Sequence, residues 1–322
     1  MERAGAERRL TSLEVDAARA LAGRVAANIA RAAEVRKEVT EHLIIAVLAG
    51  GHALIEDLPG VGKTTLARAL ARSLDLEFTR IQCTADLLPA DVVGTNVFNQ
   101  RESRFEFRPG PIFANVVLVD EINRASPKTQ SGLLECMQEG RVTVDVHTHE
   151  LARPFLVLAT QNPIEYEGTY PLPEAQVDRF MVRLSLGYPD AAGEAGMLAL
   201  HESGDRVAEL EPVADAADVL TAQDAAARIK ASEALRHYIV ALLGHTRADP
   251  RVELGASPRA GLLLLRAAKA SALLAGRDHA LPDDVQRMVE PVLSHRIVLA
   301  PDAFDVTGAQ VVAAAVQATP AL

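Results

Sequence analysis

Residues 56–65, which read Glu-Asp-Leu-Pro-Gly-Val-Gly-Lys-Thr-Thr, combine the residue types that bind phosphate groups. Gly60 and Gly62 let consecutive backbone N–H groups turn toward an anion, and the start of a following helix adds partial positive charge. Lys63 would reach the β- and γ-phosphates of a nucleotide, and the Thr64 hydroxyl would hold Mg²⁺. The sequence predicts a nucleotide-binding loop formed by Asp57, Pro59, Gly60, Val61, Gly62, Lys63, Thr64 and Thr65.

The first position of this loop is Asp57, where the usual pattern has a glycine. An aspartate fits there only if its backbone φ stays negative. The context of the loop agrees with the motif, because the apolar run 53–55 precedes it and apolar residues recur at helical spacing over 66–74.

A second apolar run, residues 116–119, ends in two acids. It would deliver Asp120 to the magnesium shell, while Glu121 polarises a water molecule for in-line attack on the γ-phosphate. Asn162 ends a later apolar run and would help to orient that water molecule. The alternative is that Asn162 and Pro163 only start a turn.

Two arginines are candidates for stabilising charge in the transition state. Arg179 could enter the phosphate site of a second subunit, and the alternative is a surface ion pair with Asp178. Arg259 lies in the first turn of a helix that Ser257 would cap, where a positive charge opposes the helix dipole. We therefore expect an anion such as the γ-phosphate near Arg259.

Four apolar runs, 53–55, 115–120, 155–160 and 180–186, and one further strand candidate, 77–83, predict the strands that position these residues. They alternate with helical patterns, which indicates an α/β fold with a parallel sheet covered on both faces. After residue 187 the chain is Ala- and Leu-rich and helical. We predict a nucleotide-binding core with N-terminal helices over 1–188 and a helical domain over 189–322, with the Ala-rich stretch 214–227 as a flexible connection.

The 322 residues carry a net charge of −10, which provides no basic face for wrapping nucleic acid. Cys83 and Cys136 have no partners at ligand spacing, which argues against zinc and against a disulfide scaffold. No apolar run reaches the length of a membrane span, and residues 1–9 lead into no apolar signal region. These features favour a cytoplasmic protein.

The motifs resemble those of AAA+ ATPases, and most closely those of the MoxR family. The stretches that carry the resemblance are DEINRASPKTQSGLLECMQE at 120–139, ATQNPIEYEGTYPLPEAQVDRF at 159–180 and GASPRA at 255–260. The similarity runs from about Val39 to Ile297. It implies an AAA+ P-loop αβα core with a parallel sheet, followed by an all-α lid domain. It also implies ATP and Mg²⁺ as cofactors, and a homo-oligomeric ring, commonly a hexamer, with its site at the subunit interface.

The resemblance implies roles for single residues: Asn162 as sensor 1, Arg179 as the arginine finger and Arg259 as the sensor 2 arginine. An aspartate at the loop position of Asp57 is common in the family. The glycine of the usual element near the adenine is missing from residues 34–37, so no adenine contacts are predicted. Arg124, His295 and Arg296 match family positions, where the sequence leaves interface and packing roles open.

Residues 93–108 and 141–151 resemble the two hairpin insertions of the family. The first, with the phenylalanine just after it, gathers four of the chain's few aromatic residues, for which we favour hairpin packing over contact with a client: Phe98, Phe105, Phe107 and Phe113. In the second, His147 and His149 favour a solvated edge over a metal site.

The leading hypothesis is an ATP-hydrolysing ring that remodels client proteins or helps to mature metalloenzymes. Family analogy adds a partner with a von Willebrand factor A domain. The alternatives are a nucleic-acid motor, against which the acidic balance counts, a metal-chelatase motor subunit, and a nucleotide-binding scaffold that does not hydrolyse.

Overall fold

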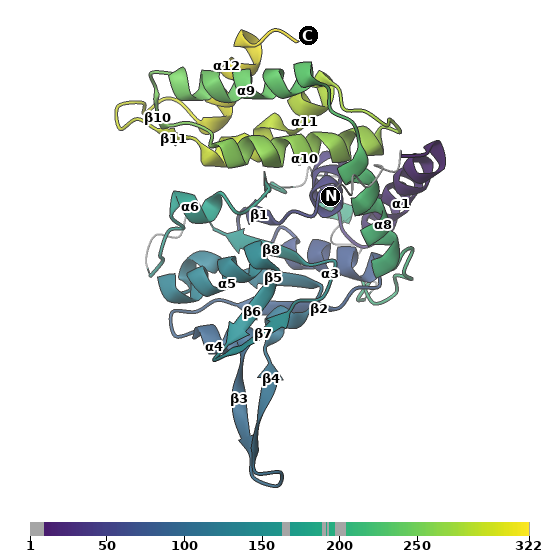
Figure 1. Ribbon diagram of the computed structural model, residues 1–322, viewed down its shortest axis with the longest axis vertical. Helices are drawn as coiled ribbons and strands as arrows, with labels where there is room; N and C mark the ends of the chain where they lie inside the picture. The colour runs from purple at the N-terminus through teal and green to yellow at the C-terminus, as the bar shows by residue number, and fades with distance from the viewer. Residues whose placement is uncertain (1–9, 163–167, 189–190, 192, 197–203, 322) are drawn as a thin grey trace, which may run out of the picture.

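The computed structural model describes residues 10–162, 168–188, 191, 193–196 and 204–321. Its centre is a five-stranded parallel sheet in the order β2-β5-β8-β1-β9 (Figure 1). The strands are β1 (Ala53–Glu56), β2 (Phe78–Gln82), β5 (Val116–Asp120), β8 (Leu156–Gln161) and β9 (Val182–Leu184). Each of the five predicted segments overlaps one of them to within a residue or two at either end, which confirms the predicted parallel sheet.

Helices cover both faces of the sheet because alternate residues of each strand point to opposite sides. Ala53 and Ile55 pack in one buried cluster with α1, α2 and α3, whereas Leu54 packs in another with α4 and α5. The helices of the core are α1 (Ser12–Ala30), α2 (Lys37–Leu48), α3 (Lys63–Ser73), α4 (Pro89–Val93), α5 (Pro127–Glu139) and α6 (Glu174–Val177), with 3-10 turns η1 (Pro111–Phe113) and η2 (Ile122–Arg124).

Two antiparallel hairpins extend from the core: β3 (Gly94–Asn99) with β4 (Arg104–Pro109), and β6 (Arg141–Val144) with β7 (His147–Glu150). Phe107 stacks on His149 at a ring distance of 4.0 Å and also contacts Phe113, so these rings join the two hairpins by packing. Phe98 and Phe105 contact each other on the long hairpin, yet they are 49% and 70% exposed.

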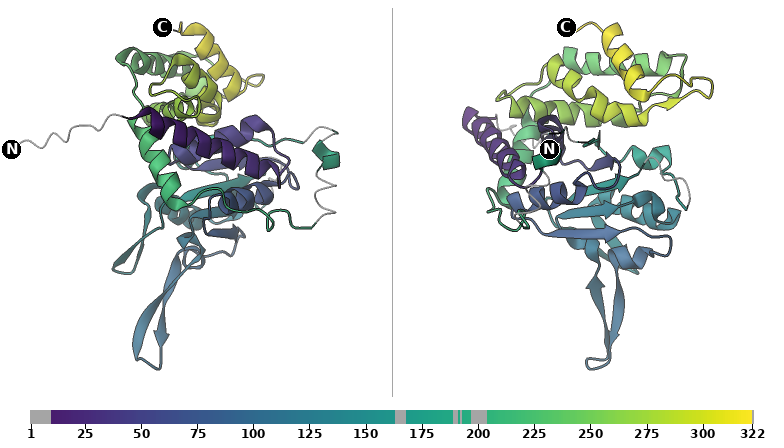
Figure 2. Two further views of the ribbon diagram at one scale, coloured as in Figure 1. Left: turned by 90° about the vertical axis from the view of Figure 1, so that its right-hand side faces the viewer. Right: turned by 180° about the vertical axis from the view of Figure 1, so that it is seen from behind.

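The C-terminal region is the predicted helical lid with one short two-stranded ribbon. Its elements are α9 (Glu233–Ala248), β10 (Val252–Leu254), α10 (Pro258–Leu274), α11 (Pro282–Leu293), η3 (Ser294–Arg296), β11 (Val298–Leu299) and α12 (Gly308–Ala318). Figure 2 shows the lid and the β3–β4 hairpin at opposite ends of the molecule. The boundary predicted between residues 188 and 189 stays a prediction, because 189 and 190 lie outside the described residues.

The Ala-rich stretch at 214–227 is a helix, and the prediction of a flexible connection was wrong. It forms α8 (Ala216–Arg228), which Asp215 caps by accepting a 2.9 Å hydrogen bond from the backbone N of Asp218. Its small side chains form a buried face that packs on α1 and α10: Val219, Ala222, Ala225 and Ala226. A biased composition had concealed regular apolar spacing.

Candidate nucleotide site

The predicted phosphate loop leads from β1 directly into α3. Gly60 and Gly62 have φ values of +87° and +89°, which side-chain-bearing residues rarely adopt, so the loop requires glycine there. Asp57 has a negative φ, as an aspartate needs at this position. The Nζ of Lys63 donates a 2.9 Å hydrogen bond to the carbonyl oxygen of Asp57 and so lies across the loop.

The Asp57 side chain has a role that the sequence did not indicate. The residue is only 7% exposed, and its carboxylate accepts hydrogen bonds from the backbone N–H groups of Leu186 and Gly187, the latter at 3.2 Å. These two residues follow β9 at the start of the connection to the lid. The aspartate therefore ties the phosphate loop to that connection, which a glycine could not do.

Asp120 ends β5 in contact with two side chains from neighbouring strands. Thr160 donates a 3.0 Å hydrogen bond to its Oδ1, and the Nε of Arg80 donates a 2.6 Å hydrogen bond to its Oδ2. The strand register explains the second contact, because Gln82 pairs with Asp120 and places Arg80 two residues earlier on the same side of β2.

Glu121 is held by both its backbone and its carboxylate. Its N–H donates to the Thr160 hydroxyl at 2.9 Å, and its Oε2 accepts hydrogen bonds from Gln82 at 3.1 Å and from Arg124 at 3.0 Å. Its φ of +55° is unusual for a residue with a side chain, and these contacts hold the strained backbone in place. Arg124 thus belongs to the surroundings of the predicted catalytic acid.

The oxygen donors at this edge fit Mg²⁺. No group of three or more His, Cys, Asp or Glu residues in the described part of the chain could hold a metal by itself. Mg²⁺ needs no such cage, since it is usually bound by one or two protein oxygens together with substrate phosphates. The carboxylate of Asp120 and the hydroxyl of Thr64 are donors of this kind. Asn162 follows β8 at the same edge and is 8% exposed, whereas Pro163 lies outside the described residues.

A cavity of about 410 Å³ lies beside the phosphate loop. Its walls are residues 32–35, the loop and start of α3 at Val61, Gly62 and Thr65, and residues 204–207. Its volume is in the range of small-molecule pockets. Although the sequence predicted no adenine contacts, this cavity is the candidate site for the base and ribose.

Arg179 lies at the opposite edge of the sheet from this loop. It precedes β9, which runs parallel to β1, whereas Lys63 follows the carboxyl end of β1. The alternative ion pair between Arg179 and Asp178 is not formed. Instead, Nη1 of Arg179 is buried without a hydrogen-bond partner among the described residues.

Arg259 lies at this same amino-terminal edge. Ser257 caps α10 by accepting a 3.0 Å hydrogen bond from the backbone N of Ala260, as expected. The Nε of Arg259 is 3.9 Å from a carboxylate oxygen of Asp178, and its Nη1 donates to Gln138 at 3.4 Å. Arg259 therefore lies beside the carboxylate of Asp178, the residue before Arg179, and both candidate arginines lie away from the chain's own phosphate loop.

Arg296 and His295 have packing roles. Nε of Arg296 donates to Asp178 at 2.8 Å, and the side chain is 2% exposed. Burial lowers the pKa of Arg296 to about 10, against the opposing effect of Asp178, so the residue stays charged near neutral pH. Burial, followed by the nearby positive charge of Arg296, lowers the pKa of His295 well below its ordinary value, so this imidazole is neutral.

Comparisons with known proteins agree with this geometry. Residues 52–182 match the ATPase family associated with various cellular activities (AAA), and residues 244–315 match the AAA lid domain. The chain is 41% identical to Chaperone MoxR1 of Mycobacterium tuberculosis, over 83% of this chain and 73% of that protein. It is 33% identical to Protein MoxR of Methylorubrum extorquens, over 90% and 91% of the two chains. This chain belongs to the MoxR family of AAA+ ATPases.

The same relationship extends to proteins without a named activity and to a solved structure. The MoxR-family chain is 50% identical to the uncharacterized protein YeaC of Bacillus subtilis, over 88% of each. It superposes with a TM-score of 0.90 on the crystal structure of a candidate ATPase from Cytophaga hutchinsonii, at 37% identity and over 96% and 97% of the two chains. In the described part of the chain, no helix is long and apolar enough to cross a membrane.

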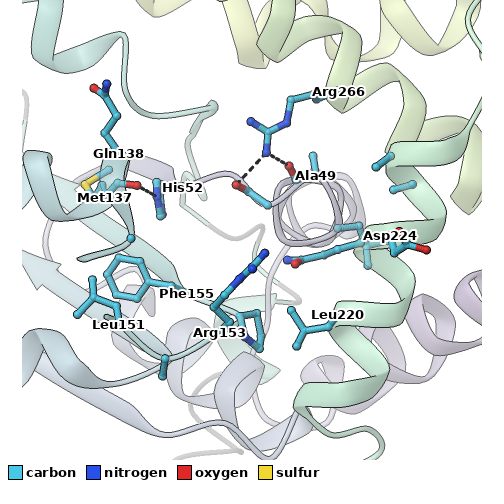
Figure 3. Close-up of a pocket in the computed structure, with 18 of the residues that line it drawn as sticks. Ala49, His52, Met137, Gln138, Leu151, Arg153, Phe155, Leu220, Asp224 and Arg266 are labelled. Atoms are coloured by element: carbon cyan, nitrogen blue, oxygen red, sulfur yellow. Dashed lines mark hydrogen bonds between the residues drawn. The ribbon is translucent and has the colours of Figure 1, made fainter. Parts of the chain in front are cut away.

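A larger cavity of this MoxR-family ATPase, about 1030 Å³, opens at the amino-terminal edge of the sheet. Figure 3 shows Arg153 projecting into it and Arg266 donating to the carbonyl oxygens of Ala49 and Gly50. Gln138, which contacts Arg259, also lines it. The cavity therefore lies next to Arg259.

Proposed function

We propose that this chain is the subunit of a ring, a hexamer, that uses Mg²⁺-dependent hydrolysis of ATP to remodel client proteins. The observation that carries the proposal is the division of the site between two edges of the sheet. Lys63 and Glu121 lie at the carboxyl edge, whereas Arg179 and Arg259 lie at the amino edge. Two chains packed head to tail bring both sets to one nucleotide, and repetition of that contact closes a ring.

The carboxyl edge would bind ATP and carry out the chemistry. The loop N–H groups and Lys63 hold the phosphates, with the base in the cavity beside residues 32–35. Thr64 and Asp120 would hold Mg²⁺, which supplies charge neutralisation at the phosphates. Glu121 accepts the proton of the attacking water molecule, and Asn162 orients that water molecule.

The amino edge of the next subunit would complete the site. Arg179 and Arg259 place positive charge against the γ-phosphate, where negative charge develops during transfer. The buried, unpartnered Nη1 of Arg179 supports this role, because an anion from a neighbouring chain would satisfy it. The cavity around Arg153 would then face the neighbouring subunit.

Client contact is best supported at the long hairpin. Phe98 and Phe105 are exposed aromatic side chains, a type enriched where proteins bind one another. The name of the relative Chaperone MoxR1 supports a remodelling role. We further propose that clients include metalloenzymes and that a partner with a von Willebrand factor A domain selects them.

A mixing experiment tests the shared site. Lys63→Ala and Arg179→Ala proteins are each expected to lack turnover. Mixed one to one, they place an intact phosphate loop opposite an intact arginine at roughly a quarter of the interfaces, so turnover should return. Mixing Lys63→Ala with Glu121→Gln is the matched control, because both defects lie on the same edge and no interface is complete. If the first mixture is as inactive as the control, the sites are not shared.

Client binding is tested separately with a Glu121→Gln protein that holds ATP. Capture from a native extract should enrich particular proteins, and adding Phe98→Ser and Phe105→Ser should abolish that capture while ATP affinity stays the same. Enrichment of nucleic acid instead would contradict the remodelling function.

A further inference from the structure

The carboxylate of Asp120 is already engaged by a cation from its own chain. Its Oδ2 accepts the 2.6 Å hydrogen bond from Nε of Arg80, and Thr160 occupies its Oδ1. The Asp120 side chain is 11% exposed and that of Arg80 is 50% exposed. The acid therefore lies inside the site, and the guanidinium covers it from the solvent side.

We propose that Arg80 is a place-holder for Mg²⁺, which neutralises Asp120 in the nucleotide-free chain and releases Oδ2 to the metal ion. The inference rests on the proposed function, since it assumes that Asp120 serves Mg²⁺. A carboxylate with so little exposure is costly without a counter-charge, and arginine supplies one at every physiological pH. Two cations cannot share one carboxylate oxygen without strong mutual repulsion, so one replaces the other.

Arg80 also begins a chain of hydrogen bonds that ends on the predicted catalytic acid. Its Nη2 donates to Oε1 of Gln82 at 2.8 Å, and Nε2 of Gln82 donates to Glu121 at 3.1 Å. Arg80 and Gln82 are two positions apart on β2, so their side chains lie on the same side of the strand. Departure of Arg80 removes the contact that orients the Gln82 amide. Glu121 is then held less firmly, which links release of the catalytic acid to occupation of the metal site.

The test measures Mg²⁺ binding rather than turnover. The chain is stripped of metal with EDTA, transferred to EDTA-free buffer and loaded with ADP, and Mg²⁺ is then titrated into the wild type and Arg80→Gln by calorimetry. A place-holder competes with the metal, so its loss should tighten Mg²⁺ binding by at least about tenfold, the typical strength of a hydrogen bond between charged groups. Arg80→Lys keeps a cation beside Asp120, so its Mg²⁺ affinity should lie close to that of the wild type.

A change in Mg²⁺ affinity in the opposite direction would identify a different role for Arg80. If Arg80 orients Asp120 for the metal, Arg80→Gln weakens Mg²⁺ binding, and that result or an unchanged affinity overturns the proposal. Arg141→Gln is the matched control, because Arg141 forms a 2.9 Å ion pair with Glu139 and is similarly exposed, at the base of the second hairpin. Its Mg²⁺ affinity should equal that of the wild type.

Binding of fluorescent ADP in EDTA separates this inference from the proposed function. Arg80→Gln should bind ADP as the wild type does, which also shows that it folds. If Arg80→Gln binds ADP but its Mg²⁺ affinity does not rise, Arg80 does not compete with Mg²⁺ for Asp120, while the proposed nucleotide binding still holds. If the wild type binds no ADP, the proposed function itself fails.

Discussion

Arg296 of the lid donates a 2.8 Å hydrogen bond from its Nε to the carboxylate of Asp178 in the core. The same carboxylate lies 3.9 Å from Arg259, and the next residue along the chain is Arg179. One ion pair, whose arginine is almost fully buried, therefore fixes the lid to the edge that carries both candidate transition-state arginines. Movement of the lid and placement of these arginines are coupled at this point.

Asp178→Asn should destabilise the chain by about 3–5 kcal/mol, because Arg296 stays charged and loses its buried partner. Urea unfolding at neutral pH measures the change. Glu139→Gln is the control, since its ion pair with Arg141 is exposed and should contribute less than about 1 kcal/mol. Equal losses in the two variants would mean that the Asp178 pair does not hold the lid.

Lys63→Ala and Glu121→Gln should separate nucleotide binding from hydrolysis. The first removes the cation over the phosphate loop and should abolish binding of fluorescent ATP. The second keeps the shape of the side chain but not the base, so binding persists while turnover falls by at least about a hundredfold. Binding and phosphate release are measured on the same samples, and substantial turnover by Glu121→Gln would remove Glu121 from the role of base.

The sheet could be predicted because its inner strands β5, β8 and β1 are mostly apolar, and the phosphate loop because its glycines must adopt positive φ. The contacts of Arg80 and Gln82 could not be predicted. A charged and a polar residue on an edge strand resemble a solvated face, and only the pairing of Gln82 with Asp120 brings them to the acids. That pairing joins residues 38 positions apart and leaves no local pattern.

The position of Arg259 shows the same limit. Its conflict with the helix dipole indicated a nearby anion, but not which chain supplies it. That depends on where the lid sits, and the lid is held by contacts between residues more than a hundred positions apart, such as Arg296 with Asp178. The roles of Asn162, Arg179 and Arg259 remain predictions.

Asp57→Gly restores the usual loop pattern and should nevertheless destabilise the chain. The N–H groups of Leu186 and Gly187 would lose their acceptor, which costs about 1–3 kcal/mol for a buried donor. Nucleotide binding should persist, because Lys63 and the loop N–H groups are unchanged. Thermal unfolding with and without ADP checks both points. Asp57→Asn keeps one acceptor oxygen and should lose less stability than Asp57→Gly. A gain in stability in Asp57→Gly would show that the hydrogen bonds from Leu186 and Gly187 to Asp57 do not stabilise the chain.

His52 should make the core sensitive to mild acid. Its Nδ1 accepts a 3.0 Å hydrogen bond from the backbone N of Val157, so its Nε2 carries the proton and donates to Met137 at 3.0 Å. Burial lowers the pKa of His52 to about 4. The unfolded chain, with an ordinary histidine pKa of about 6.5, binds more protons between these values. Stability is therefore complete above about pH 6.5 and falls as the pH drops toward 4, by about 3 kcal/mol in total.

The midpoints of urea unfolding, measured at several pH values between 7 and 4.5, give the slope of stability against pH. In His52→Gln the titrating group is gone, so the chain should be less stable at pH 7 and lose less stability on acidification than the wild type. His237→Gln provides the control, because the His237 side chain is 75% exposed and its loss should leave the slope unchanged. Parallel curves for the wild type and His52→Gln would show that His52 is not the group responsible.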